Sequence, residues 1–204
     1  MSSAIASIRL LGLSGSLRRA SHCTAILRTL AVTLSDRARL DLFDLAAIPL
    51  YNQDLDADGG PDSVRTLKAA IAAADGVVLV SPEFNYGMSG VLKNALDWAS
   101  RPAYTSVFKN KPSLVITASP AFTGGVRAQA QIIETLVAML AHVVATPQVV
   151  VAAVHEKVAE GRLVDDAALR FALGAVDALL RDIALRKLAA LRSSEHDTGG
   201  AFVP

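Results

Sequence analysis

A run of hydroxyl and guanidinium side chains lies in the stretch Gly12-Leu-Ser-Gly-Ser-Leu-Arg-Arg-Ala-Ser21. Ser16 and Ser21 can donate hydrogen bonds through their hydroxyl groups, and Arg18 adds a positive charge. The first backbone amides of a helix also attract anions, because their free N–H groups and the helix dipole act at the same place. The stretch therefore predicts a loop that binds one phosphate group. The alternative interpretation is an ordinary capped helix with surface arginines.

Aromatic and amide side chains follow in a second stretch, Pro82-Glu-Phe-Asn-Tyr86. Pro82 restricts the backbone where this stretch begins. Backbone groups together with Phe84 and Tyr86 can line a planar ring. The two stretches together suit a ligand that carries a phosphate at one end and a flat ring at the other.

Both stretches follow predicted strands and precede predicted helices. Gly76 to Val80 is a short apolar run rich in valine, typical of a central parallel strand that is buried on both faces. Residues 5–13 are mostly apolar and predict the first strand. Open α/β sheets bind ligands at the carboxyl ends of their strands. We therefore expect the two stretches to meet at one edge of a sheet.

Apolar periodicity predicts the remaining elements. Further strands are expected at residues 38–43, 112–119 and 148–154, and helices at 21–34, 63–74, 89–98, 129–142 and 165–191. Strands that alternate with helices predict an α/β fold: a five-stranded, parallel, doubly wound sheet with helices on both faces. We expect residues 1–192 to form a single domain and residues 193–204 a flexible C-terminal tail.

Composition argues against several kinds of partner. The 204 residues have a formal net charge of +1, and the basic residues are dispersed, so nucleic acid is not expected to bind. Apolar runs such as residues 143–154 are shorter than the roughly 20 residues that cross a bilayer. No N-terminal targeting pattern is recognisable, so we expect a cytoplasmic protein without a membrane partner. The histidines lie far apart in the sequence, which predicts no metal site.

The sequence resembles the NADPH-dependent FMN reductase family of flavodoxin-like proteins, which includes bacterial quinone, chromate and azo-dye reductases. The matching motifs are Gly15-Ser-Leu-Arg-Arg-Ala-Ser21, Ser81-Pro-Glu-Phe-Asn-Tyr-Gly-Met-Ser-Gly-Val-Leu-Lys-Asn-Ala-Leu-Asp-Trp98 and, more weakly, Thr123-Gly-Gly-Val-Arg127. The resemblance extends over residues 5–190. It implies a flavodoxin-like fold, FMN as cofactor, and NADPH or NADH as electron donor.

The resemblance also implies which residues bind the cofactor. Those expected around the phosphate are Ser16, Leu17, Arg18, Ser21 and Cys23, and those expected along the ribityl chain and the ring are Pro82, Glu83, Phe84, Asn85, Tyr86 and Ser119. The sequence departs from the family pattern at Cys23, where Asn is frequent, at Phe84, where Tyr is usual, and at Ser89, where Pro commonly precedes the glycine. Either Cys23 or Thr24 would then replace the Asn side chain near the phosphate.

The predicted function is electron transfer from NAD(P)H through bound FMN to a small acceptor: a quinone, an azo compound, chromate or free flavin. No catalytic acid or base is expected among the side chains, because the flavin carries the chemistry. One alternative is a flavodoxin-type electron carrier, although such carriers are usually strongly acidic and this chain is near neutral. Another is a flavin-free interaction module on the same fold. The physiological acceptor and the choice between NADPH and NADH stay open.

The single cysteine raises the alternative of a thiol enzyme. Tyrosine phosphatases of low molecular weight share this general architecture and use a low-pKa thiolate, followed after five residues by arginine. Arg28 follows Cys23 after only four residues, and the glycine-containing loop precedes the cysteine. We therefore expect Cys23 to be a structural thiol that is not needed for turnover.

The segment that carries the second motif holds more apolar groups than one sheet face should need. These groups are Tyr86, Met88, Val91 and the stretch Trp98-Ala-Ser-Arg-Pro102. Aromatic and apolar side chains are enriched at the centres of interfaces, and homo-oligomers are most often twofold symmetric. The sequence therefore predicts a homodimer or homotetramer with the cofactor near the subunit boundary.

Overall fold

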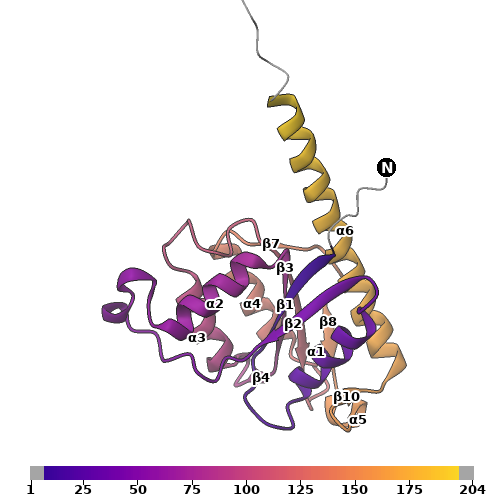
Figure 1. The fold of residues 1–204 in the computed structure, drawn as a ribbon. Coiled ribbons are helices and arrows are strands. Elements are labelled where there is room, and N and C mark those ends of the chain that lie inside the picture. Colours follow the sequence, from indigo (N-terminus) through magenta and orange to yellow (C-terminus); the bar gives the residue numbers. More distant parts are fainter. Residues whose placement is uncertain (1–6, 198–204) are drawn as a thin grey trace, which may run out of the picture.

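A parallel β-sheet runs through the centre of the computed structural model, which describes residues 7–197 (Figure 1). Its strands are β1 (Ile8–Ser14), β2 (Ala38–Phe43), β3 (Gly76–Ser81), β6 (Pro112–Ala118), β7 (His142–Val143) and β8 (Val149–Val151). The strand order is β2-β1-β3-β6, β7 and β8 both pair with β6, and all of these pairings are parallel. This is the order of doubly wound, flavodoxin-like sheets, so the predicted fold class is confirmed.

The fifth position of the sheet differs from the prediction, because two short strands share it. β7 pairs with the start of β6 at Pro112 and Ser113, and β8 pairs with its end, from Ile116 to Ala118. Pro147 lies between the two short strands and has no N–H to donate to a strand ladder. The expected strand at 148–154 is reduced to Val149–Val151, because Ala153 adopts a left-handed φ angle of 47° and a short helix begins at Val154.

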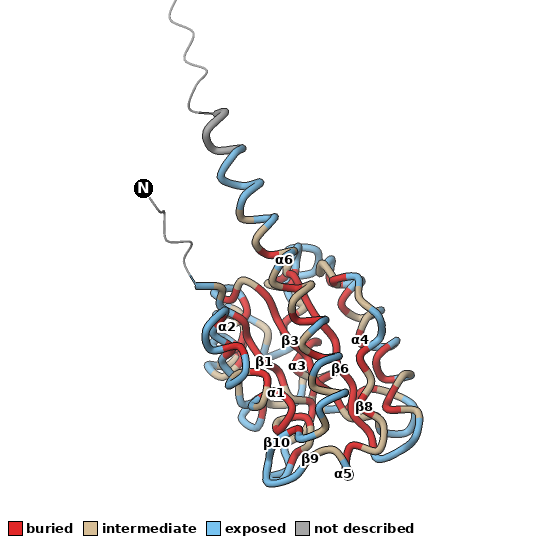
Figure 2. Tube along the Cα trace, turned by 90° about the vertical axis from the view of Figure 1, so that its right-hand side faces the viewer, coloured by how far each residue is buried: buried red, intermediate tan, exposed pale blue. Residues whose placement is uncertain are grey.

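Helices cover both faces of the sheet. The helices on one face are α1 (His22–Thr33), α5 (Val154–Lys157) and α6 (Asp166–Asp197), and those on the other are α2 (Asp62–Ala73), α3 (Gly90–Ala99) and α4 (Val126–Ala138). Ile26, Leu30 and Val176 belong to the first core layer, and Leu92 and Ile132 to the second. Every residue of β3 and β6 is buried between the layers (Figure 2). The central strands therefore give the site a rigid support.

Several short elements were not predicted. They are the hairpin of β4 (Glu83–Phe84) and β5 (Gly87–Met88), the hairpin of β9 (Val158–Ala159) and β10 (Arg162–Leu163), and the 3-10 turns η1 (Gln53–Leu55) and η2 (Ala57–Gly59). Runs of two or three residues carry too little periodicity to be recognised in a sequence.

Side-chain caps hold the starts of three helices. Ser21 Oγ accepts a hydrogen bond from the Thr24 amide, Ser89 Oγ from the Leu92 amide, and Asp165 Oδ1 from the Ala168 amide. Such caps satisfy amide groups that lack a partner inside the helix.

The fourth helix is displaced from its prediction. It was expected at residues 129–142 and instead runs from Val126 to Ala138. The Glu83 carboxylate accepts hydrogen bonds from the amides of Arg127 and Ala128 and so fixes an earlier first turn. His142 belongs to β7 rather than to the helix.

The C-terminal helix α6 is longer than predicted and ends at Asp197 instead of near residue 191. Its last turns project beyond the sheet, at the edge opposite the loops that follow β1 and β3 (Figures 1 and 2). Residues 193–197 of the expected tail are thus helical, while 198–204, like residues 5 and 6 of the expected first strand, lie outside the described residues. Between residues 7 and 197, no helix combines the length and the apolar character needed to cross a membrane.

Candidate functional site

The loops after β1 and β3 touch each other at one edge of the sheet. The Gly15 amide donates a hydrogen bond to the Val80 carbonyl oxygen at 2.8 Å. A Cβ atom at Gly15 would lie 2.8 Å from Ser89 Oγ and 2.9 Å from Ser81 Oγ. Such distances are too short for any side chain, so the close contact between the loops requires glycine. The two predicted binding stretches therefore lie side by side, as two halves of the candidate site.

A cavity of about 490 Å³ opens beside the first loop. Its lining comprises Ser14, Ser16, Leu17, Arg18, Arg19, Thr24, Arg28, Leu42, Phe43, Asp44 and Leu45. Three residues of the predicted phosphate set, at positions 16–18, are among them. Within the described chain, the amides of residues 17–19 have no hydrogen-bond partner. Free amides beside arginines form a concave site for an anion, which fits a phosphate group.

The hairpin of β4 and β5 forms the other half of the site. Asn85 and Tyr86 have φ angles of 49° and 67°, the left-handed conformation that a two-residue type I′ turn needs. The hairpin leaves Phe84 57% and Tyr86 73% exposed. The Arg127 guanidinium carbon lies 4.3 Å from the centre of the Tyr86 ring, a cation–π contact. The hairpin thus offers backbone and aromatic surface to a flat ring.

The profile of NADPH-dependent FMN reductases matches residues 8–156, a range that contains both halves of the site. The chain belongs to this family. It is 41% identical over 162 residues to the NAD(P)H-dependent FMN reductase PA1204 of Pseudomonas aeruginosa, covering 79% of this chain and 87% of that one. It is 35% identical over 175 residues to the quinone reductase of Escherichia coli, covering 84% and 93%.

A solved structure supports the same assignment. The flavoenzyme NAD(P)H:acceptor oxidoreductase FerB of Paracoccus denitrificans matches with a TM-score of 0.76 and 32% identity, covering 87% of this chain and 97% of that one. The predicted family, cofactor and enzyme class are confirmed by these similarities. The FMN reductase is an oxidoreductase that takes electrons from NAD(P)H and passes them to small acceptors.

Ser21 and Cys23 are placed differently from the prediction for the FMN reductase. Ser21 is only 4% exposed, and its hydroxyl accepts the hydrogen bond that caps α1. Cys23 is 2% exposed and belongs to the core layer beneath α1, where burial raises the pKa of its thiol to about 12. Thr24 lines the cavity instead, and its hydroxyl donates to Ser14 Oγ at 2.9 Å. Of the two residues that could replace the family's Asn, Thr24 is thus the one whose polar side chain lines the cavity.

A buried, protonated thiol should be inert. We expect Cys23 in the native FMN reductase to resist iodoacetamide at pH 8, because a pKa of about 12 leaves almost no thiolate. It should react fully once urea has unfolded the protein, because the exposed thiol regains its ordinary pKa of about 8.5. Mass spectrometry reads the labelling, and Cys23→Ser should retain NAD(P)H oxidation. Fast labelling of the native protein, or loss of turnover in a folded, FMN-loaded Cys23→Ser variant, would contradict this assignment.

Glu83 connects the β4–β5 hairpin to the first turn of α4. Its side chain is 10% exposed, and one carboxylate oxygen accepts the amide hydrogens of Arg127 and Ala128 at 3.0 and 3.1 Å. A negative charge at the start of α4 is also favoured by the helix dipole. Glu83, predicted to line the cofactor, therefore ties the hairpin to α4.

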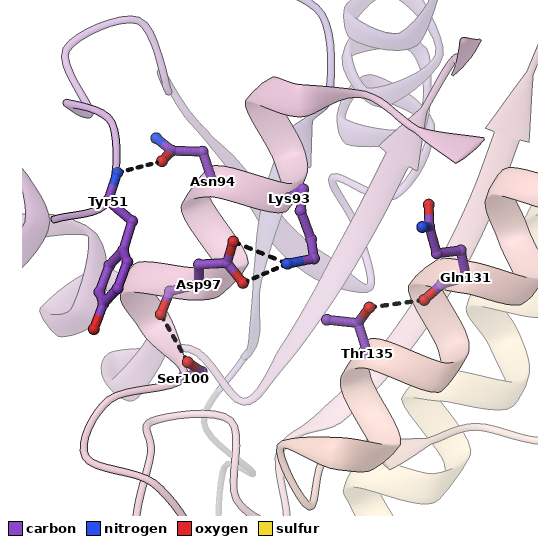
Figure 3. A network of polar contacts seen from close by, with 7 residues as sticks. All are labelled: Tyr51, Lys93, Asn94, Asp97, Ser100, Gln131 and Thr135. Atoms are coloured by element: carbon purple, nitrogen blue, oxygen red, sulfur yellow. Dashed lines mark hydrogen bonds and ion pairs between the residues drawn. The ribbon is translucent and has the colours of Figure 1, made fainter. Parts of the chain in front are cut away.

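Gln131 is a positioning residue that the sequence did not reveal. Its Oε1 accepts a hydrogen bond from the Met88 amide at 2.7 Å, so α4 also holds the second strand of the hairpin. Figure 3 shows Gln131 and Thr135 on α4, with Lys93 and Asp97 of α3 bonded to each other nearby. A glutamine on a helix surface gives no sequence signal, because the same residue type is common on solvated faces.

Ser119 and Pro82 contribute through the backbone of their loops. Ser119 is 6% exposed, and its hydroxyl accepts a hydrogen bond from the Ala121 amide. The Ser81 hydroxyl donates to the Pro82 carbonyl oxygen at 2.9 Å. Both contacts shape the turns that leave β3 and β6, next to the ring half of the site.

Asn94 and Trp98 of α3 hold a neighbouring loop. The Asn94 side-chain nitrogen and the Trp98 indole nitrogen both donate to the Pro49 carbonyl oxygen at 2.8 Å. Asn94 Oδ1 accepts the amide hydrogen of Tyr51 (Figure 3). These polar groups of the second motif therefore have structural partners.

Proposed function

We propose that the FMN reductase is a quinone reductase whose FMN lies across the contact between the two loops. The observation that carries this proposal is the close approach at Gly15, which joins an anion-binding cavity to an exposed aromatic hairpin. FMN, when bound, supplies the electron transfer. Arg18, with the free amides beside it, would hold the phosphate, and the backbone of residues 82–86 would carry the ring. The names of the relatives favour quinones as acceptors.

Steady-state kinetics with a panel of electron acceptors test this function. FMN-loaded enzyme would be given NADPH or NADH together with a benzoquinone, an azo dye, chromate or free FMN. We expect the largest kcat/KM with the quinone. Turnover with none of the small acceptors would support the electron-carrier alternative, and absence of saturable FMN binding would support the flavin-free alternative.

Arg18 should distinguish phosphorylated from unphosphorylated flavin. We expect Arg18→Ala to weaken FMN binding by about 10- to 100-fold, since a hydrogen bond to a charged group contributes about 1.5–3 kcal/mol. Riboflavin lacks the phosphate, so its affinity should change by less than about threefold. Calorimetric titration measures both affinities, and Arg192→Ala, far along α6, is the control. Equal losses for the two flavins would place Arg18 away from the phosphate.

We also propose a homodimer, although two of the residues that the sequence suggested for its interface are buried within the subunit. Met88 is 8% exposed and Trp98 is fully buried, so both pack within the subunit. Tyr86 and Tyr104, on either side of α3 in the sequence, are each 73% exposed, and Val137 on α4 is 58% exposed. Exposed aromatic groups next to a site suit an interface.

Light scattering tests the homodimer. We expect twice the subunit mass at micromolar concentration, and Tyr104→Asp with Val137→Asp should shift the mass to that of a monomer. Val32→Asp, on the opposite helix layer, should leave the mass unchanged. A monomeric mass for the fully active, FMN-loaded enzyme would show that one subunit completes the site.

The cytoplasm is the proposed location of the enzyme. Its one cysteine is free, which suits a reducing compartment. Activity that follows a periplasmic marker in cell fractions would oppose this location.

A further inference from the structure

The cavity beside the phosphate loop extends farther than the phosphate of FMN. The strand order β2-β1-β3 sets three loops in a row at one edge of the sheet. The ring half follows β3, the phosphate half follows β1, and the remaining cavity lining, residues 42–45, lies at the end of β2. A line from the ring through the phosphate thus continues toward β2.

An arginine lies on this continuation. Arg28 follows Thr24 by four residues on α1, so both side chains are on one helix face, and both line the cavity. Arg28 is seven residues beyond the capping Ser21, which is about 10 Å along the axis at 1.5 Å per residue. Among the residues that the structure describes, Arg18, Arg19 and Arg28 have no ion-pair partner. Arg28 is therefore a free cation beyond the amides that suit the first phosphate.

A second hollow adjoins the cavity at Arg28. It has a volume of about 640 Å³, and both Arg28 and Leu42 line it together with the cavity. Much of its remaining lining is aliphatic, with Val32 70% and Val164 55% exposed. Exposed aliphatic side chains around a concave surface suit a flat, weakly polar group such as a nucleobase.

We propose that this site accepts FAD as well as FMN. The proposal rests on the proposed FMN site, because the flavin and first phosphate would bind as in FMN. The second phosphate would pair with Arg28, and the adenine would pack on Leu42 and Val32. Asp44 stands at the end of β2, where dinucleotide-binding sheets place the acid that holds the adenosine ribose. Its Oδ1 accepts the Ala46 amide hydrogen, which orients the carboxylate.

Calorimetric titration of the flavin-free chain with FMN and with FAD tests the proposal. We expect the wild-type dissociation constant for FAD to lie within about tenfold of that for FMN, a difference of at most about 1.4 kcal/mol. Arg28→Gln should weaken FAD about tenfold and FMN less than threefold, because only FAD carries a second phosphate. Val32→Asp should also weaken FAD selectively. Arg192→Gln, with the same charge change on the far end of α6, should alter neither affinity.

The outcomes separate this proposal from the proposed function. FMN binding with FAD more than about 100-fold weaker would overturn the FAD site and leave the FMN reductase intact. Equal effects of Arg28→Gln on both flavins would overturn it too, by assigning Arg28 to the first phosphate. If FMN-saturated enzyme binds ADP and Arg28→Gln abolishes that binding while leaving FAD affinity unchanged, the hollow serves the nucleotide donor and not FAD. Failure of both flavins to bind would overturn both proposals.

Discussion

Replacing Gly15 by valine should weaken FMN binding by about 100-fold or more while the chain stays folded. A Cβ atom at this position would lie 2.8 Å from Ser89 Oγ, 2.9 Å from Ser81 Oγ and 3.2 Å from Pro82 Cδ. Valine adds two further methyl groups at the same place. Overpacking of a tight contact costs about 1–3 kcal/mol, and because both serine hydroxyls are held in hydrogen bonds, we expect the loops to move apart. The phosphate half and the ring half would then no longer fit one ligand.

Calorimetric titration measures the affinity for FMN, and a thermal melt of the flavin-free protein shows whether the chain stays folded. Gly174→Val is the matched control, because a Cβ at Gly174 on α6 meets no atom within 4 Å. It should leave FMN affinity unchanged. If Gly15→Val bound FMN as tightly as the wild type, contact between the loops would not be what forms the site.

The sequence was most informative where the pattern is local. The valine-rich run of β3 and the starts of the helices near Ser21 and Ser89 depend on neighbouring residues, and all three were predicted. The phosphate loop was likewise recognisable, because a strand, a short polar loop and a helix follow one another along the chain.

The ring half was less predictable because distant residues build it. Glu83 bonds to amides 44 and 45 residues away, and Met88 to a glutamine 43 residues away. No periodicity reports such contacts, so the hydrogen bonds of Glu83 to α4 were not foreseen and the start of α4 was placed three residues late.

The sequence also did not predict which side chains of α1 point toward the cavity. Consecutive residues of a helix point about 100° apart, so Cys23 and Thr24 face different surroundings. Packing decides between them: Cys23 enters the core layer, and Thr24 bonds to Ser14. The alternatives for this position could be stated from the sequence but not resolved.

Glu83 is a residue through which α4 holds the hairpin in position. Its carboxylate joins β4 to the first turn of α4, and Gln131 joins β5 to the next turn. Arg127, whose amide bonds to Glu83, also covers the Tyr86 ring. The exposed hairpin therefore keeps its shape through contacts below it, which leaves its outer surface for a ligand.

Loss of the Glu83 carboxylate should accordingly affect stability and turnover together. We expect Glu83→Ala to lower the free energy of unfolding by about 2–3 kcal/mol, because two helix-end amides, one of them part-buried, lose a charged acceptor. Without this tie the hairpin would move, and kcat/KM with a quinone should fall at least about tenfold. Glu83→Gln keeps an oxygen acceptor and should lose about 1 kcal/mol.

Arg127→Ala distinguishes the hydrogen bonds that Glu83 accepts from backbone amides from the ion pair between Glu83 and Arg127. It keeps both backbone donors and removes a guanidinium that lies 3.8 Å from the carboxylate and is about half exposed. Exposed ion pairs contribute only about 0–1 kcal/mol, so this variant should remain nearly as stable as the wild type. Urea unfolding and steady-state kinetics give the two readouts for all three variants. A Glu83→Ala protein with wild-type stability and kcat/KM would show that the hairpin holds its position without α4, and that the link between them is incidental.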